Sequence, residues 1–189
     1  MRGLPFGNKR GQFYRGNLHT HSTLSDGHKT PEQVCALYQT LGYDFLALTD
    51  HFLEQYGYPL TDTRAYRSKT FTTLLGAELH APRTVNGNLW HILAVGLPLD
   101  FAPLGAGEDG PQIAQRAMNA GAFVAIAHPG WYHLTEADAL SLGKVDAIEV
   151  FNGTSIDHND APDGWGLADM LSDKGHRYWI CATDDAHIT

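Results

Sequence analysis

Short apolar segments alternate with helix-like segments along almost the whole chain, and this alternation is the feature that most restricts the fold. Residues 45–49, 123–127 and 178–183 are typical of buried strands, because each is short and mainly apolar. Residues 31–41 carry apolar side chains at helical spacing, and Thr30 is the expected N-cap of that helix. Short apolar strands separated by helices predict a parallel α/β fold, either a doubly wound sheet or a barrel.

The same pattern places the other elements. The segments 71–79 and 89–96 predict two strands that could form a hairpin, because Asn86-Gly87-Asn88 between them is typical of a turn. Further strands are predicted at 17–22 and 145–151, helices at 111–120, 135–142 and 166–174, a helical turn at 61–68 and a loop at 98–110.

Composition narrows the class of protein. The 189 residues, 43% hydrophobic and 18% charged, are typical of one globular domain. A net charge of −8 without a basic block weighs against a nucleic-acid polymer as partner. Because no run of 18 apolar residues occurs, no membrane span is predicted. Residues 1–15 are interpreted as an N-terminal extension without a secretory signal, and Cys35 and Cys181 as reduced thiols, so a cytoplasmic location is expected.

Eleven histidines are present, against 13 lysines and arginines together, and their positions indicate the chemistry. His19 and His21 are two residues apart on a predicted strand, so their side chains share a face. Burying many ionisable groups at one end of a sheet is unfavourable unless they bind metal, and His with carboxylate suits Zn, Mn or Fe. The groups at or near strand ends are His19, His21, Asp26, His51, Glu78, His91, His128, Asp184, Asp185 and His187.

The segments HTHSTLSDG, ALTDH, GAELHA, WHILAVG, AIAHPGW and ATDDAH resemble, in this order, the motifs of the PHP (polymerase and histidinol phosphatase) family. The resemblance spans residues 16–187, and RGNLHTHSTLSDG also resembles the carbaryl-hydrolase-like branch of that family. It implies an α/β fold, a distorted seven-stranded (β/α)7 barrel with a metal site at the C-terminal strand ends. It also implies hydrolysis of phosphate esters with Mn, Zn or Fe.

The family's ligand pattern implies two or three divalent metal ions, with Glu78 bridging two of them. The first ion would be held by His19, His21, Glu78 and Asp185, the second by Glu78, His91 and His128, and the third by Asp26, His51 and His187. A metal-bound water would be the nucleophile, because shared metals lower the pKa of water toward neutrality.

Two acidic residues beside these ligands have two interpretations. Asp50 and Asp184 are candidates for the acid that protonates the leaving group, or for residues that orient a histidine.

Other residues are candidates for contact with substrate. Arg83 could bind a phosphate dianion, or could be an ordinary exposed arginine. His80 could line the pocket or form hydrogen bonds with the ligands, and Asn152 could bind substrate or cap a turn. Trp131 and Tyr132 could form an aromatic wall or cover the barrel mouth.

The leading interpretation is a metal-dependent phosphoesterase that acts on a small-molecule phosphomonoester or phosphodiester. A carbamate, ester or amide hydrolase with the same metal site is the first alternative, because a metal-activated water also attacks a carbonyl group. A non-catalytic structural or interaction module is the second. Residues 16–189 would form the PHP domain. Since barrels of this kind usually exceed about 200 residues, the sequence also predicts a C-terminally incomplete chain with apolar surface near the last strand.

Overall fold

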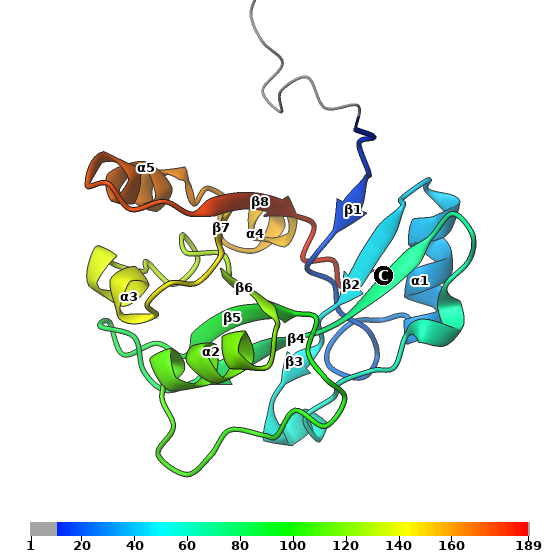
Figure 1. The fold of residues 1–189 in the computed structure, drawn as a ribbon, viewed down its shortest axis with the longest axis horizontal. Helices are drawn as coiled ribbons and strands as arrows, with labels where there is room; N and C mark the ends of the chain where they lie inside the picture. The colour runs from blue at the N-terminus through cyan, green and yellow to red at the C-terminus, as the bar shows by residue number, and fades with distance from the viewer. Residues whose placement is uncertain (1–10, 189) are drawn as a thin grey trace, which may run out of the picture.

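The computed structural model describes residues 11–188, which form a mixed α/β fold around a nearly closed, barrel-shaped sheet (Figure 1). Seven strands follow one another around it: β1 (Gly16–Asn17), β2 (Phe45–Leu48), β4 (Thr72–Ala81), β5 (Trp90–Val95), β6 (Phe123–Ile126), β7 (Ala147–Asn152) and β8 (Trp179–Thr183). The short β3 (His51–Phe52) pairs with β4 beyond the end of β2. The predicted fold class is confirmed. Most of the predicted extension at 1–15 lies outside the described residues.

The first strand is shorter than predicted, because β1 consists of Gly16 and Asn17 alone and so includes one residue of the predicted 17–22. Beyond it, Thr20 forms an isolated parallel bridge with Ala186, and the His21 N–H donates to the Ala186 carbonyl at 3.0 Å. The buried Asn17 amide donates to the His19 carbonyl and holds this irregular backbone in place. The two ends of the sheet therefore meet where the histidines lie.

The barrel is distorted because β5 runs antiparallel to both of its neighbours. β4 and β5 form the predicted hairpin, in which the Gly87 N–H donates to the Thr84 carbonyl and Gly87 has a φ of 81°. A reversed strand brings its first residues to the end where parallel strands finish. His91, the second residue of β5, is therefore in register with His80, near the end of β4.

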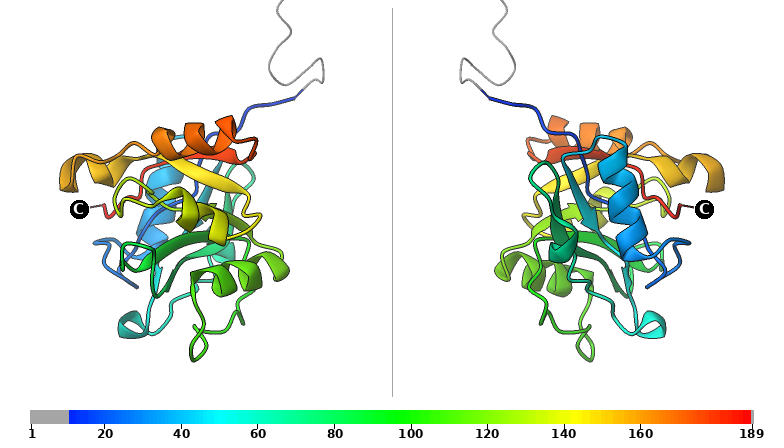
Figure 2. Two further views of the ribbon diagram at one scale, coloured as in Figure 1. Left: turned by 90° about the vertical axis from the view of Figure 1, so that its left-hand side faces the viewer. Right: turned by 90° about the vertical axis from the view of Figure 1, so that its right-hand side faces the viewer.

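The longer helices pack outside the sheet (Figures 1 and 2). The helices are α1 (Pro31–Thr40), α2 (Gly110–Asn119), α3 (Glu136–Ser141), α4 (Gly153–His158) and α5 (Trp165–Asp173), with short 3₁₀ helices at Glu54–Tyr56 and Arg64–Tyr66. Thr30 caps α1 as predicted, and its side chain accepts from the Gln33 N–H. α4 was not predicted. None of the helices within residues 11–188 is long and apolar enough to cross a membrane.

The two faces of the sheet contribute to different apolar clusters. Ile92 and Ala94 of β5 pack with the buried Ile113 of α2 outside the barrel. Leu93 lies between them in sequence and so points to the other face, where it packs with small residues such as Ala125. Small interior side chains leave space at the barrel end that the ionisable residues occupy.

The last strand, β8, has exposed apolar side chains and carries Cys181, one of the two cysteines. Trp179 and Ile180 are 76% and 54% exposed, which confirms the predicted apolar surface near this strand. Burial raises the pKa of Cys35 to about 11, and burial together with the charge of Glu149 raises the pKa of Cys181 to about 12.

Both thiols are therefore neutral at pH 8, and the neutral form is a poor nucleophile. We expect iodoacetamide at pH 8 to alkylate both cysteines at least about 100-fold more slowly in the native chain than in the urea-unfolded chain. Peptide mass spectrometry over time measures both rates. Equal native and unfolded rates at either cysteine would contradict the burial described here.

Candidate metal centre

One end of the barrel gathers all nine residues that the sequence predicted as metal ligands. The strands place them there because parallel strands end at the same edge, while β5 begins at it. The contributing segments are the turn after β1 (His19, His21 and Asp26), β3 (His51), β4 (Glu78), β5 (His91), the second residue after β6 (His128) and the segment after β8 (Asp185 and His187).

Glu78 is at the middle of the cluster, and its carboxylate is fully buried. Its Oε1 atom is 2.7 Å from His91 Nδ1 and 3.0 Å from His128 Nε2. His19 Nε2 is 3.7 Å from the same oxygen. These are three of the groups that the sequence predicted around a bridging glutamate.

The other oxygen of Glu78 faces three further imidazoles. Its Oε2 atom is 2.5 Å from His51 Nδ1 and 3.7 Å from both His21 Nε2 and His80 Nε2. Six imidazoles therefore surround one carboxylate, and four of the six histidines are buried. Of these, His80 was predicted near the site but not as a ligand.

A second carboxylate bridges the first two histidines. Asp185 Oδ1 is 2.9 Å from His21 Nε2 and 3.2 Å from His19 Nε2. Asp185 has a φ of 48°, in the left-handed region that non-glycine residues avoid, so the surrounding contacts must hold it there. One such contact is the Asn152 amide, which donates to Asp185 Oδ2 at 3.0 Å.

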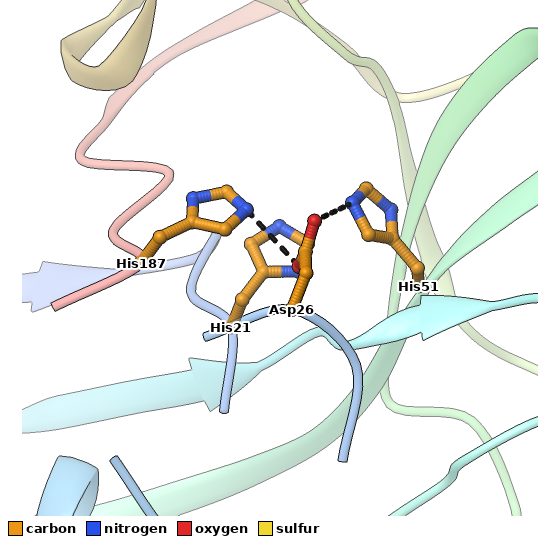
Figure 3. Close-up of side chains that lie close together, drawn as sticks. All are labelled: His21, Asp26, His51 and His187. Atoms are coloured by element: carbon orange, nitrogen blue, oxygen red, sulfur yellow. Dashed lines mark ion pairs between the residues drawn. The ribbon is translucent and has the colours of Figure 1, made fainter. Parts of the chain in front are cut away.

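A third carboxylate, Asp26, lies at the edge of the cluster (Figure 3). Its Oδ1 is 3.2 Å from His187 Nε2, and its Oδ2 is 3.2 Å from His51 Nε2. These are the three residues predicted to share one ion. His21 also points toward them, because its ring stacks on that of His187 with centroids 4.3 Å apart.

The carboxylates and imidazoles strongly affect one another's protonation. Burial alone would raise the pKa of Asp26, but hydrogen bonds from His187 and His51 hold it well below its ordinary value. Burial opposes charge on His51, yet Glu78 and Asp26 raise the pKa of His51 to about 10. Burial holds the pKa of His80 well below its ordinary range. The carboxylates thus hold protons on some imidazoles, and a cation would compete with those protons for the same atoms.

Several buried atoms of the cluster, some of them close to other ionisable atoms, form no well-aligned hydrogen bond, which is unfavourable in an interior without a ligand. Within the described residues, these atoms are His19 Nε2, His21 Nε2, Glu78 Oε2, His80 Nδ1, His128 Nδ1 and Asp185 Oδ1. Imidazole nitrogens and carboxylate oxygens without cysteine form the donor set of a borderline divalent cation such as Zn, Mn or Fe. The residues present therefore fit metal ions, and four groups of them bring their ligand atoms within 4.8 Å of one another.

Glu149, in the middle of β7, was missed by the sequence analysis. It is buried, its Oε1 is 3.0 Å from His19 Nδ1, and its Oε2 accepts the His128 backbone N–H at 2.6 Å. Asn152 and Thr183 donate to the same carboxylate. One acidic residue within the apolar strand AIEVFN was the available signal, because a carboxylate in a buried strand needs partners.

The two acidic residues predicted beside ligands have structural contacts. Asp50 accepts from the Ser22 N–H at 2.7 Å and from the Ser25 hydroxyl at 2.8 Å, and so fixes the turn that leads to Asp26. Asp184 accepts from the Tyr38 hydroxyl at 2.8 Å and also lines the cavity above the cluster. Their role as acids stays a prediction.

The candidates for substrate binding lie in different places. Arg83 is exposed and is outside the cavity lining. His80 is buried beneath the cluster, 2.9 Å from His51 Nδ1. Asn152 caps α4, since its side chain accepts from the Ser155 N–H, and it also holds Asp185. Their contacts with substrate are untested predictions.

A cavity of 850 Å³ opens onto the cluster. Trp131 and Tyr132 line one side of it, and the Tyr132 ring lies 4.4 Å from that of His91. Thr154 and Asp157 of α4 are on another side. Among residues 11–188, no lysine or arginine lines this cavity, so positive charge for an anionic substrate would have to come from its histidines or from bound cations.

Solved structures share this fold. A two-domain protein from Bacteroides vulgatus that contains a predicted PHP-like metal-dependent phosphoesterase matches with a TM-score of 0.65 and 24% identity, over 92% of this chain and 52% of that one. A predicted metal-dependent phosphoesterase from Bifidobacterium adolescentis matches with a TM-score of 0.65 and 14% identity, over 94% of this chain and 89% of that one. An amidohydrolase from Chromobacterium violaceum, with bound sulfate and no metal, matches with a TM-score of 0.69 and 18% identity, over 92% of this chain and 87% of that one.

These comparisons establish the class of fold. The chain spans about half of the Bacteroides protein, and at these identities the likeness concerns the barrel rather than the activity. No protein-family model and no curated protein matches the sequence. The chain is thus a distorted α/β barrel, similar to structures named as PHP-like phosphoesterases, with a His, Asp and Glu cluster that could hold metal ions.

Proposed function

We propose that this chain is a metal-dependent hydrolase of the PHP family and that it acts on a small-molecule phosphate ester. The observation that carries the proposal is the buried Glu78 carboxylate with six imidazoles around it, in a cluster that contains unpartnered donor atoms. Apolar side chains would stabilise the interior at least as well as this many buried histidines. The arrangement therefore indicates that the histidines bind a ligand.

The proposed centre would hold three ions, and the four close groups of ligand atoms support it. His19, His21, Glu78 and Asp185 would hold the first, and Glu78, His91 and His128 the second. Asp26, His51 and His187 would hold the third. Divalent cations bound there would lower the pKa of water and neutralise charge that develops on phosphoryl oxygens.

The protein residues have supporting tasks. Glu149 and Asn152 orient His19 and Asp185 through buried hydrogen bonds. Trp131 and Tyr132 form an apolar wall against which the leaving group can pack. Of the two acids that the sequence predicted, Asp184 lines the cavity and would give a proton to a leaving oxygen, whereas Asp50 is engaged by hydrogen bonds from the 22–25 turn.

A second candidate is a carbamate, ester or amide hydrolase with the same metal site. The cavity lining favours keeping it, because a neutral carbonyl substrate needs no arginine or lysine beside the metals. The fold similarity to an amidohydrolase is compatible with it.

Turnover by metal-loaded protein distinguishes the two. The chain is stripped with chelator, loaded separately with Mn²⁺, Zn²⁺ or Fe²⁺, and assayed on p-nitrophenyl phosphate, bis(p-nitrophenyl) phosphate, p-nitrophenyl acetate and a p-nitrophenyl carbamate. We expect hydrolysis of a phosphate ester that falls at least about 100-fold in His91→Ala and in His128→Ala. The exposed His176 is outside the cluster, so His176→Ala is the matched control and keeps full activity.

Other outcomes decide against the phosphoesterase. Turnover of the carbonyl substrates alone, with the same dependence on His91 and His128, would establish the second candidate instead. Full metal loading without turnover of any of the four substrates would favour a non-catalytic module.

A further inference from the structure

His51 presents its two ring nitrogens to two different parts of the cluster. Its Nε2 is 3.2 Å from Asp26 Oδ2, on the side where His187 also lies (Figure 3). Its Nδ1 points the other way and is 2.9 Å from His80 Nε2 and 2.5 Å from Glu78 Oε2. One imidazole therefore connects the edge of the cluster with its buried interior.

The position of the proton on the neutral His51 ring decides which of its nitrogens can bind a cation beside Asp26. An imidazole nitrogen binds a metal only when it carries no proton. A neutral His51 that binds through Nε2 must have its proton on Nδ1, and a buried N–H needs an acceptor. Two acceptors are within reach, Glu78 and His80.

Glu78 is already engaged on both sides. Its Oε1 is close to His91 Nδ1 and His128 Nε2, and its Oε2 also faces His21. The proposed ions would draw on the same oxygens, which leaves Glu78 a poor acceptor for His51 once the site is loaded.

His80 has no such competing partner. Its side chain is 1% exposed, its Nδ1 atom makes no hydrogen bond, and it is absent from the cavity lining, so substrate does not reach it. A proton on Nδ1, although it has no acceptor among the described residues, leaves Nε2 as the acceptor for His51. His80 is fixed on β4, where it pairs in register with His91.

We propose that His80 is a positioning residue that accepts a hydrogen bond from His51 Nδ1 and so keeps His51 Nε2 free for the cation beside Asp26 and His187. This inference rests on the proposed metal site, and it gives His80 a role other than substrate contact. Orientation of a metal-binding histidine through its second nitrogen is typically worth about 10–100-fold in metal affinity.

Two variants of similar shape test the role. His80→Gln places an amide oxygen near the position of Nε2 and so keeps an acceptor, whereas His80→Met has similar length and offers only a weak one. Chelator competition with elemental analysis counts the ions per chain and their affinities, and His51→Gln marks the ion that belongs to the Asp26 group. We expect His80→Met to weaken that ion about 10–100-fold, and His80→Gln to restore most of the affinity.

Nitrogen NMR on ¹⁵N-histidine-labelled, Zn²⁺-loaded wild-type chain gives a readout that does not depend on a variant's folding. It should place the His51 proton on Nδ1. A proton on Nε2, or equal affinity for the marked ion in wild type and His80→Met, would overturn the inference.

Three further outcomes separate the inference from the proposed function. Equal losses in His80→Gln and His80→Met would make His80 a direct ligand and overturn the positioning role. If wild type binds no ion that His51→Gln removes, both the three-ion site and this role fail. If the ions bind as expected and no substrate is hydrolysed, only the proposed function fails, because ion affinity is the quantity compared.

Discussion

Replacing Glu78 by Gln should remove at least one ion from the proposed metal centre while leaving the barrel folded. Glu78 is the carboxylate that six imidazoles approach, and the proposed first and second ions share it. The amide is almost the same size but is neutral and is a poor metal ligand, so at least one ion per chain should be lost. Activity should fall about 10³-fold or more, which exceeds the 10–100-fold expected for residues that only orient ligands.

Elemental analysis and steady-state kinetics on the same preparation measure both effects. Glu32→Gln is the matched control, because Glu32 is exposed on α1 and undergoes the same chemical change. Far-ultraviolet circular dichroism should be unchanged in both variants. Unchanged ion content in Glu78→Gln would show that the glutamate is not a ligand.

Replacing Glu149 by Gln should have the largest effect on stability. Its buried carboxylate has four donors around it, from His19, the His128 backbone, Asn152 and Thr183. A glutamine can accept through only one oxygen, and its NH₂ group then faces donors. Because a buried charged partner is lost, we expect the free energy of unfolding of the metal-free chain to fall by about 3–5 kcal/mol.

The same substitution should also weaken metal binding. His19 loses the acceptor that orients its ring, which predicts a 10–100-fold lower affinity for the ion that His19 holds. Urea unfolding of the metal-free chain and a separate metal titration distinguish the two effects. The control Glu32→Gln should stay within about 0.5 kcal/mol of wild type. A Glu149→Gln chain as stable as that control would show that the β7 carboxylate is not the anchor described here.

Much of the site could be predicted from sequence because its residues occur at strand ends. His19, His51 and His128 each follow or interrupt an apolar segment, and a barrel brings such positions to one edge. The turn residues Asn86-Gly87-Asn88 also predicted the β4–β5 hairpin. The reversed direction of β5 explains how His91 reaches the same edge.

Other features depend on contacts between distant segments, and the sequence gives only weak evidence of them. Glu149 is one polar residue in an apolar strand, and its four donors come from residues up to 130 positions away. The closure of the barrel uses one bridge between Thr20 and Ala186 instead of a regular strand. α4 begins at Gly153 and has only six residues, so its local propensity is low and the Asn152 cap defines it. The carbaryl-hydrolase-like branch stays a prediction from sequence.

In the proposed metal centre, the carboxylates of Glu78, Asp185 and Asp26 hold metal ions together with the histidines around them. Anomalous diffraction from crystals grown with Mn²⁺ or Zn²⁺ tests it most directly. We expect anomalous peaks within ligand distance of Glu78, one toward His91 and His128 and one toward His19 and His21, with a third between Asp26 and His187. A map without peaks at these positions, from crystals that hold millimolar metal, would contradict it.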